Sequence, residues 1–504
     1  MLKKIIYNIL MLNLSLAFIG CSDFLEPEMK GATNIDMLLS TEKGIQTAMN
    51  GVYEPLIGLY KSNMSVLTDQ ASDDGWTWRF EQNVDLFIMS PEHQTISSVW
   101  KGHFDGIGRA NVVLDNLINI KDFKDEKTRN YIEGQAKFMR AFYYFNLVRL
   151  FGGVPILEHS IKTIDDTQIP RSSIQEVYVF IKTNLDEAEK LLPEEFSGDA
   201  NFENGRPTKY TVNALKALVH LELGEWEQVV ASTDKIIGKG ELLKDYAKNF
   251  NGTAENGNQS LFEVQYGGVT TSTTTGISSF YAPTAAPYSG GSNILPTDDS
   301  FEGTGGGITT GNGFVQLFDD RPEDNRKNVI LSTYGLPNFI DANKPDGSLY
   351  FVNKYYNSVD PRGKSTWNFP LIRYAEILLA KAEALNELKY ESNGEALNLV
   401  NMIRENAGLS KLLGTEYTTQ ETFREYIMKE RRIELAFECK RFFDLNRRGI
   451  LQSAIQLQMD YMGVKFPENK LITHPITKKR YYLYPIPSTE FVNNALLGEQ
   501  NPGY

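Results

Sequence analysis

The chain has 504 residues, 41% of them hydrophobic and 23% charged, a composition typical of a globular protein with enough apolar residues for a large core. The formal net charge of −13 argues against nucleic acid as a partner, because a polyanion would be repelled and no basic stripe offsets that repulsion. Two cysteines in so long a chain argue against a disulfide framework.

The start of the chain has the pattern of a bacterial lipoprotein signal. Lys3 and Lys4 are followed by an apolar stretch from Ile5 to Ile19, which is too short and too interrupted by polar residues for a membrane-spanning helix. Bacterial lipoproteins are cut and acylated at Gly-Cys junctions such as Gly20–Cys21. We therefore predict that residues 1–20 are a signal peptide and that Cys21 is lipidated, giving an anchored, otherwise soluble protein with no later membrane span. The alternative is an ordinary signal peptide with an accidental cysteine.

From about residue 40 to 240 the pattern is helical. The strongest predicted helix is Gln135–Leu150, in which aromatic residues recur at three- and four-residue spacing and which Gly152–Gly153 ends. Further helices are predicted over Ser172–Leu192, Lys209–Leu223 and Glu225–Ile237, with Gly224 as the turn between the last two. A helix, a short glycine turn and a second helix form the unit of tetratricopeptide arrays, so we expect stacked helical hairpins.

The segment from about 240 to 370 has a different character. It is rich in Gly, Ser, Thr, Asn and Pro, with aromatic residues between them, and this composition predicts loops and short strands. Long ordered loops on a rigid helical frame are often functional. We therefore expect ligand binding in this part of the chain.

Helical hairpins return from about 370 to 450, before a C-terminal tail over 450–504. The predicted helices are Ile372–Leu388, Glu395–Glu405, and one that opens with a capping box of Thr418 and Glu421 and runs to about Phe437. The charges of Glu430, Arg431, Arg432 and Glu434 in that last helix predict a buried or semi-buried network of ion pairs. The fold class that follows is mainly α, with tetratricopeptide-like hairpins supporting a large irregular half.

Six motifs occur in the order typical of SusD/RagB lipoproteins, and the chain resembles that family over nearly its whole mature length. The motifs are CSDFLEP at 21–27, FMRAFYYFNLVRLFGGVP at 138–155, RYAEILLAKAEALNEL at 373–388, VNMIRENAGL at 400–409, ERRIELAFECKRFFDLNRRG at 430–449, and YLYPIPSTE with the final QNPGY. Three positions depart from the usual pattern, namely Gln135, Cys439 and Arg448, and all three lie in scaffold segments.

The resemblance implies one SusD-like domain over residues 21–504, held at the outer face of the outer membrane by a lipid anchor. It also implies a TonB-dependent β-barrel transporter of the SusC type as partner, for which the lipoprotein acts as lid and receptor. The leading hypothesis is a non-catalytic protein that binds an oligosaccharide or polysaccharide and delivers it to that transporter. Three alternatives stay open: capture of peptides or glycopeptides, a structural lid with little ligand affinity, and a hydrolase.

Motifs for catalysis, metals and cofactors are missing or incomplete. The five histidines show no pair at helical metal-binding spacing, Gly303–Gly313 matches neither phosphate-loop pattern, and Asp341–Gly347 lacks the final glutamate of a calcium loop. Adjacent acidic pairs, at 73–74, 165–166, 298–299 and 319–320, would serve glycoside hydrolysis only if two carboxylates lay about 5 to 10 Å apart, which a sequence cannot establish. We therefore expect no cofactor, no metal-binding motif and no enzymatic activity, and the sequence leaves open whether a structural metal orders the loops.

The segment DDGWTWR, residues 73–79, is the strongest candidate for sugar binding. The apolar face of a pyranose stacks on indole rings such as those of Trp76 and Trp78, while its hydroxyl groups pair with carboxylates and guanidinium groups such as those of Asp73, Asp74 and Arg79. The alternative is that one or both tryptophans cap the hydrophobic core. Second-rank candidates are Tyr281, Tyr288 and Trp367, the last being slightly more typical of a core residue, and Trp100 is expected to be structural.

Overall fold

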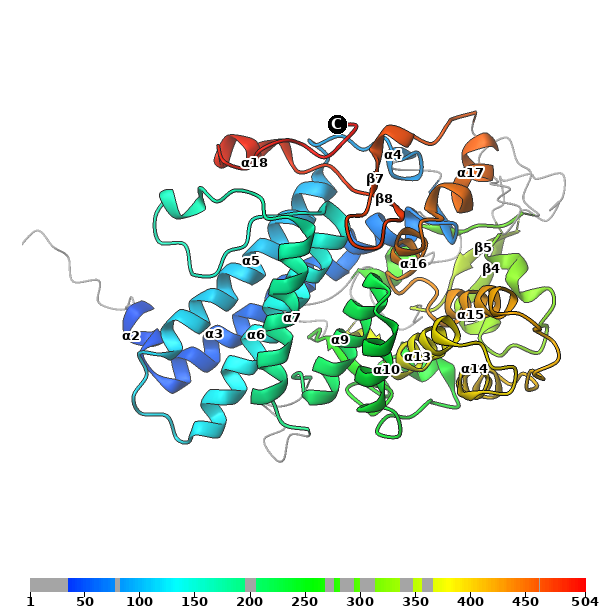
Figure 1. Cartoon of the computed structure of the whole chain (residues 1–504), viewed down its shortest axis with the longest axis horizontal. Helices are drawn as coiled ribbons and strands as arrows, with labels where there is room; N and C mark the ends of the chain where they lie inside the picture. Colours follow the sequence, from blue (N-terminus) through cyan, green and yellow to red (C-terminus); the bar gives the residue numbers. More distant parts are fainter. Residues whose placement is uncertain are drawn as a thin grey trace, which may run out of the picture.

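The computed structural model describes residues 35–77, 82–194, 205–267, 276–281, 294–299, 313–335, 348–355, 366–461 and 463–504. A row of helices forms its scaffold (Figure 1). Within it α3 (Glu42–Gly58), α5 (Gln94–Leu117), α6 (Glu126–Phe151) and α7 (Ile174–Leu191) pack in chain order. The row continues through α9 (Lys209–Leu223) and α10 (Trp226–Asp234) to α13 (Tyr374–Leu388), which packs on α14 (Glu395–Asn406) and α15 (Gln420–Glu434). The predicted mainly α class, with stacked helical hairpins, is confirmed.

Local signals fix several helix ends where the sequence predicts them. Ser173 begins α7 with a capping box, and Thr208 begins α9 in the same way. Gly152 after α6 and Gly224 after α9 have φ angles of 77° and 70°, which glycine adopts without steric cost. The hairpin of α9 and α10 therefore turns at Gly224, as the sequence predicts.

Three predicted boundaries in the C-terminal block are wrong. Ile372 and Arg373 belong to strand β6 (Phe369–Arg373), because they pair with β2 (Ser260–Val264), and the helix begins at Tyr374, two residues later than predicted. The N-cap of α15 is Thr419, which accepts a hydrogen bond from the backbone N–H of Thr422, so the proposed Thr418–Glu421 box does not form. This helix ends at Glu434, ahead of a turn in which Phe437 has a φ angle of 57°.

Four short antiparallel strand pairs lie in the described residues. The β2–β6 pair and the pair of β1 (Gly75–Trp76) with β3 (Leu295–Pro296) join segments far apart in the sequence. The other two pairs join neighbouring segments, β4 (Leu331–Gly335) with β5 (Ser348–Val352) and β7 (Leu471–Thr473) with β8 (Arg480–Tyr482). The described parts of residues 240–370 contain only short helices, in agreement with the predicted loops and short strands.

The remaining short helices are α2 (Ile35–Leu39), η2 (Leu59–Asn63), η3 (Val66–Gln70), α4 (Gln82–Asp85), η4 (Asp165–Thr167), η5 (Tyr246–Asn249), α11 (Ile277–Tyr281), η6 (Val315–Phe318), α12 (Lys327–Ile330), α16 (Arg441–Arg448), α17 (Leu451–Tyr461), η7 (Glu468–Lys470) and α18 (Ser488–Asn493).

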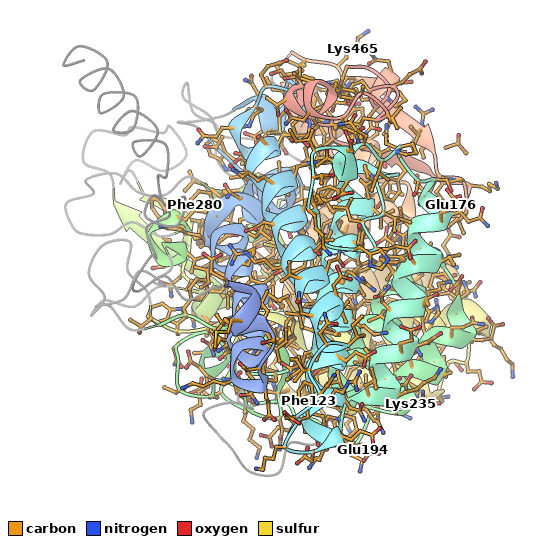
Figure 2. The ribbon with its side chains drawn as sticks, turned by 90° about the vertical axis from the view of Figure 1, so that its left-hand side faces the viewer. Phe123, Glu176, Glu194, Lys235, Phe280 and Lys465 are labelled. Atoms are coloured by element: carbon orange, nitrogen blue, oxygen red, sulfur yellow. The ribbon has the colours of Figure 1, made fainter. Side chains whose placement is uncertain are left out.

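The main cluster of buried hydrophobic side chains runs from Leu39 to Leu497 and joins the helical row to the irregular half, and a small second cluster lies between α9, α10 and α13. In the view of Figure 2, Phe123 and Glu194 lie at one end of the N-terminal helices and Lys465 at the other, while Phe280 marks the irregular side. Trp100 of α5 is 3% exposed and packs within this core, which confirms its predicted structural role. Among the described residues, no helix combines the length and apolarity that a membrane span requires.

Candidate functional site

The segment from Asp73 to Thr77 follows η3 and lies inside the protein. Asp73 and Asp74 are each 1% exposed and Trp76 is 4% exposed. Its strand β1 pairs with β3, and Thr297 just beyond β3 donates hydrogen bonds from its backbone N–H to the Asp74 carbonyl oxygen (2.9 Å) and from its hydroxyl to the Asp73 carbonyl oxygen (2.7 Å). The predicted sugar-binding segment is therefore anchored to a part of the chain more than 200 residues away.

Two arginines from the C-terminal block neutralise the acidic pair. Arg441 holds Asp73 in a two-point ion pair, with Nε–Oδ1 and Nη2–Oδ2 distances of 2.7 and 2.8 Å. Arg432 lies between both acids, with its Nε 2.6 Å from Asp74 Oδ1 and its Nη2 2.7 Å from the Asp73 carbonyl oxygen. Bidentate guanidinium–carboxylate contacts of this kind fix geometry as well as charge.

The two carboxyl groups differ in their proton affinity. Burial raises the pKa of Asp73, but the two arginines more than offset that effect, so its pKa lies below the ordinary value. Burial also raises the pKa of Asp74, Arg432 offsets part of this rise and the neighbouring Asp73 adds to it, so its pKa lies above the ordinary value. Both acids are occupied by internal partners and are buried, so neither is placed to protonate a glycosidic oxygen.

The Trp76 ring packs in the interior, and its indole N–H donates to the carbonyl oxygen of Pro296 at 3.2 Å. Sugar stacking needs an exposed ring face, which Trp76 does not present in this structure. The alternative in which one of the two tryptophans belongs to the core therefore describes Trp76. Trp78 and Arg79 lie outside the described residues, as do Tyr288 and Cys21.

Tyr281 and Trp367 are also buried. Tyr281 is 0% exposed, and its hydroxyl donates to Asp69, four residues before Asp73. Trp367 is 4% exposed and packs beside Gly252. The structure thus brings Tyr281 close to the Asp73–Trp76 segment through Asp69, while Trp367 occupies a core position, as its sequence context favours.

The same two arginines line part of a surface hollow of about 270 Å³. It is lined by Asp299, Gln316, Leu317, Glu425, Met428, Lys429, Arg432, Arg441 and Ile450. Carboxylate, amide, ammonium and guanidinium groups alternate here with three apolar side chains, a mixture that suits the hydroxyl groups and C–H faces of a sugar. Its volume is near the lower end, about 300 Å³, of small-ligand pockets.

The sequence alone does not predict this hollow. It predicts Arg432 only as a member of an ion-pair network, and it does not indicate that Arg441 or Gln316 lines a ligand site. Arg441 and Asp73 are 368 positions apart, and no local sequence pattern predicts that they form an ion pair. The one available signal is the Asp298–Asp299 pair, whose members are bridged by Gln316: its side-chain amide donates to Asp298 Oδ1 (2.8 Å) and its carbonyl oxygen accepts from the Asp299 backbone N–H (2.9 Å).

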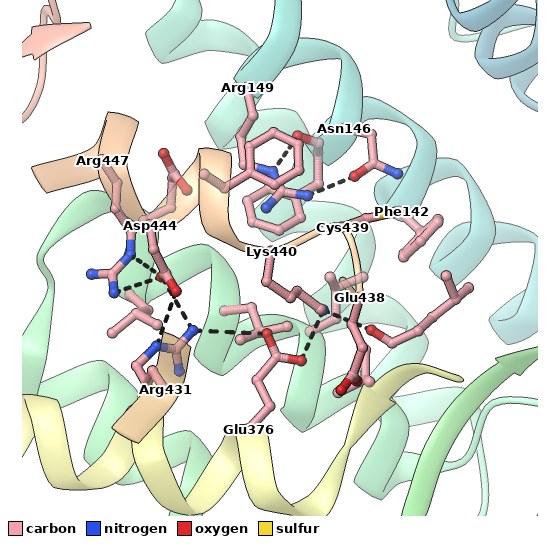
Figure 3. A pocket seen from close by; sticks show the side chains of 18 of the residues that line it. Phe142, Asn146, Arg149, Glu376, Arg431, Glu438, Cys439, Lys440, Asp444 and Arg447 are labelled. Carbon is pink, nitrogen blue, oxygen red and sulfur yellow. Dashed lines mark hydrogen bonds and ion pairs between the residues drawn. The ribbon is translucent and has the colours of Figure 1, made fainter. Parts of the chain in front are cut away.

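A second cavity, lined mainly by charged and aromatic side chains, lies between α6, α9, α13 and α16 (Figure 3). Arg431 and Arg447 both contact Asp444 Oδ1, at 3.2 and 2.8 Å, and Lys440 Nζ lies 2.8 Å from Glu376 Oε2. With a volume of about 50 Å³ it has room for a water molecule or two, and a sugar ring does not fit. We interpret this cavity as structural.

The predicted ion-pair network in α15 is confirmed. Glu430 pairs with Arg326 at 2.7 Å and Glu434 with Arg373 at 2.9 Å, and all four side chains are buried. Buried charges of this kind need partners, which Glu430 and Glu434 receive from two segments distant in the sequence. Among the described residues, no group of three or more His, Cys, Asp or Glu side chains is arranged to hold a metal ion.

Comparisons with known proteins agree along the chain. A family model described as "Starch-binding associating with outer membrane" matches residues 23–221, and a model described as "SusD family" matches residues 319–504. The SusD-like protein P2 of Formosa agariphila is 30% identical over 99% of both chains. The starch-binding protein SusD of Bacteroides thetaiotaomicron is 24% identical over 92% of this chain and 89% of its own.

Solved structures show the same fold. A SusD homolog from Bacteroides thetaiotaomicron superposes with a TM-score of 0.75 at 20% identity, covering 93% of this chain and 98% of its own. A structure described as a laminarin-binding SusD-like protein gives a TM-score of 0.70 at 24% identity, with coverages of 91% and 99%.

Proposed function

The chain belongs to the SusD family, and from this membership we propose that it binds an oligosaccharide or polysaccharide at the cell surface and delivers it to a TonB-dependent outer-membrane transporter. The observation that carries the proposal is similarity along nearly the entire chain to a starch-binding protein and other SusD-like proteins. The family consists of binding proteins without enzymatic activity. Acylation at Cys21 would hold the protein at the outer face of the outer membrane.

The ligand site that we propose combines the hollow above Arg432 and Arg441 with Trp78 and Arg79. The β1–β3 pair and the two arginines hold the chain firmly up to Thr77, immediately before these two residues. A rigid base of this kind lowers the entropy that a ligand must offset on binding. Asp73, Asp74, Trp76 and Tyr281 then support the site from within, and direct ligand contacts come from neighbouring residues.

We expect Trp78→Ala to weaken binding of the cognate glycan by roughly ten- to a hundred-fold, because loss of one stacking ring costs on the order of 1 to 3 kcal/mol. The matched control is Trp76→Ala. Its buried ring should instead cost about 3 to 5 kcal/mol of stability and lower the melting temperature. A glycan array on the soluble protein identifies the ligand, and calorimetry with thermal unfolding then measures both variants.

Unchanged affinity in Trp78→Ala would remove this residue from the site. Binding of a peptide library in preference to every glycan would favour the peptide-capture alternative. A neutral glycan should bind with little salt dependence, because it displaces few ions, and should remain intact after overnight incubation with the protein. A new product that persists through repurification would contradict a purely binding function.

A further inference from the structure

A larger surface hollow, of about 560 Å³, lies between the end of α7 and the start of α9. Its volume is within the range of about 300 to 1,000 Å³ that is typical of small-ligand pockets. It shares no lining residue with the candidate ligand hollow at Arg432 and Arg441. We call it the α7–α9 hollow.

Two carboxylates of the α7–α9 hollow already have cationic partners. Glu189 pairs with Lys235 at 2.6 Å through Oε1 and with Lys216 at 2.8 Å through Oε2. Lys216 also contacts Asp186, with 2.6 Å between Nζ and Oδ1. These two acids are therefore compensated within the protein and have little charge left to repel an anion.

Two ammonium groups of the hollow, by contrast, are unpaired. Lys190 and Lys209 line it, and neither forms an ion pair or a side-chain hydrogen bond with the part of the chain that the structure describes. Together with Lys216, the lining residues carry three carboxylates and four ammonium groups, a formal charge of +1. In a chain with a net charge of −13, this hollow is a local site that attracts an anion.

A buried amide at the hollow calls for a hydrogen-bond donor. Asn213 lines the hollow and is 2% exposed. Its Nδ2 donates to Glu189 Oε1 at 3.0 Å and to the Lys209 carbonyl oxygen at 2.8 Å, which fixes the orientation of the amide. Its Oδ1 accepts no hydrogen bond from the described residues. Because an unpaired buried oxygen is costly, a hydroxyl group that enters the hollow would stabilise it.

We propose that the α7–α9 hollow is a second binding site, which takes acidic units of a glycan, those that carry a carboxylate or a sulfate ester. The anionic group lies at Lys190 and Lys209, a sugar hydroxyl donates to Asn213, and the ring of Tyr210, which also lines the hollow, offers a face to C–H groups. The choice of a sugar as carrier of the charge rests on the proposed function. The position of the site and the sign of its charge rest on the hollow alone.

The test is calorimetric titration of the non-acylated mature chain with uronate and sulfated trisaccharides, each beside its carboxyl-reduced or desulfated counterpart. Wild type should bind the acidic members more tightly than the neutral ones, with an affinity that falls as NaCl is raised from about 50 to 500 mM. Lys190→Gln with Lys209→Gln should weaken acidic binding by about five- to tenfold, the sum of two modest contributions from partly exposed charges. Binding of the neutral counterparts should not change.

The matched control is Lys61→Gln with Lys465→Gln, which removes the same charge from two exposed lysines outside both hollows. In Figure 2, Glu194 and Lys235 of the α7–α9 hollow lie together at the lower end of the helices, and Lys465 lies at the opposite end. This control should bind the acidic trisaccharides as wild type does. An equal loss in both double variants would show only an effect of net charge and would overturn the inference.

Four further results would overturn it. They are equal binding of acidic and neutral trisaccharides, wild-type affinity in Lys190→Gln/Lys209→Gln, equally tight binding of tri-glutamate, which would assign the hollow to acidic peptides, and equally tight binding of inorganic phosphate, which would mean an adventitious ion only. Each of these leaves the proposed function intact as long as a glycan binds at Trp78. Binding of no glycan of any kind would instead contradict the proposed function itself and, with it, the sugar assigned to this hollow.

Discussion

The carboxyl group of Asp69 is completely buried and lies between groups that donate to it. The hydroxyl of Tyr281 donates to Oδ2, and the backbone N–H of Cys439 donates to Oδ1 at 3.0 Å. Burial raises the pKa of Asp69 to about 7, because these hydrogen bonds only partly replace the lost hydration of the charged form, and the nearby Asp74 raises it further. A single carboxyl thus joins η3, α11 and the turn before α16.

This raised pKa makes the stability of the protein depend on pH near neutrality. In the unfolded chain Asp69 titrates near about 3.9, so between about pH 4 and pH 7 the folded state binds more protons than the unfolded state. The contribution of Asp69 to stability is therefore complete below pH 4 and is lost as the pH rises through 7. We expect the melting temperature of Asp69→Asn, measured relative to wild type, to rise between pH 5 and pH 8.

The comparison isolates Asp69, because every other titratable group is present in both proteins. The amide keeps the size of the carboxyl and has no charge to bury. A melting-temperature difference that stays constant from pH 5 to pH 8 would show that Asp69 does not titrate in this range.

At the scale of elements, the β1–β3 pair depends on a glycine. A Cβ atom at Gly75 would lie 2.7 Å from Cγ2 of Ile294 and 2.8 Å from the carbonyl oxygen of Asp69, both too close for a carbon atom. Gly75→Ala should therefore push β1 away from β3 and destabilise the protein by about 1 to 3 kcal/mol, the usual cost of overpacking. Thermal unfolding measures this loss.

The control for this prediction is Gly58→Ala. Gly58 is the last residue of α3, and a Cβ atom there would meet no neighbouring atom within 4 Å, so alanine should be neutral or stabilising. Equal melting temperatures for the two alanine variants would show that β1 tolerates displacement. Weakened glycan binding in Gly75→Ala would further support a ligand site that begins where β1 ends.

The elements differ in how far the sequence alone predicts them. Gly224 marks the end of α9 as predicted, and α7 begins two residues after the predicted Ser172, because helix ends depend on residues within one turn. Ile372 has the spacing of a helix residue but lies in β6, since its pairing with Phe262 is a tertiary contact.

The candidate site likewise combines features that the local sequence predicts with features that depend on distant contacts. Aromatic and acidic residues of residues 73–79 indicate binding chemistry, but which of them face inward depends on partners such as Arg441 and Pro296, more than 200 positions away. These contacts between distant residues cannot be predicted from a single sequence. For this reason the sequence predicts Trp76 as a candidate ligand platform, whereas its ring lies in the core.

At the scale of the whole molecule, the helical row and the irregular half share one core, while their surfaces differ. The candidate ligand hollow lies against the C-terminal helices α15 and α16, and the main cluster of buried hydrophobic side chains connects these helices with the N-terminal row.

Attachment to the membrane is the remaining property of the whole molecule, and Cys21 is the residue on which we expect it to depend. Acylation stabilises membrane attachment by about 0.8 kcal/mol for each buried methylene group. Residues 22–34 separate Cys21 from α2, a chain that reaches at most about 50 Å when fully extended.

Cys21→Ala should abolish incorporation of a radiolabelled fatty acid and release the protein from washed membranes of a strain that lacks the transporter. Cys439→Ala is the matched control, because the buried Cys439 thiol is out of reach of acylation and its loss should leave labelling unchanged. Continued labelling of Cys21→Ala would place the lipid on another residue and refute the signal that the sequence predicts.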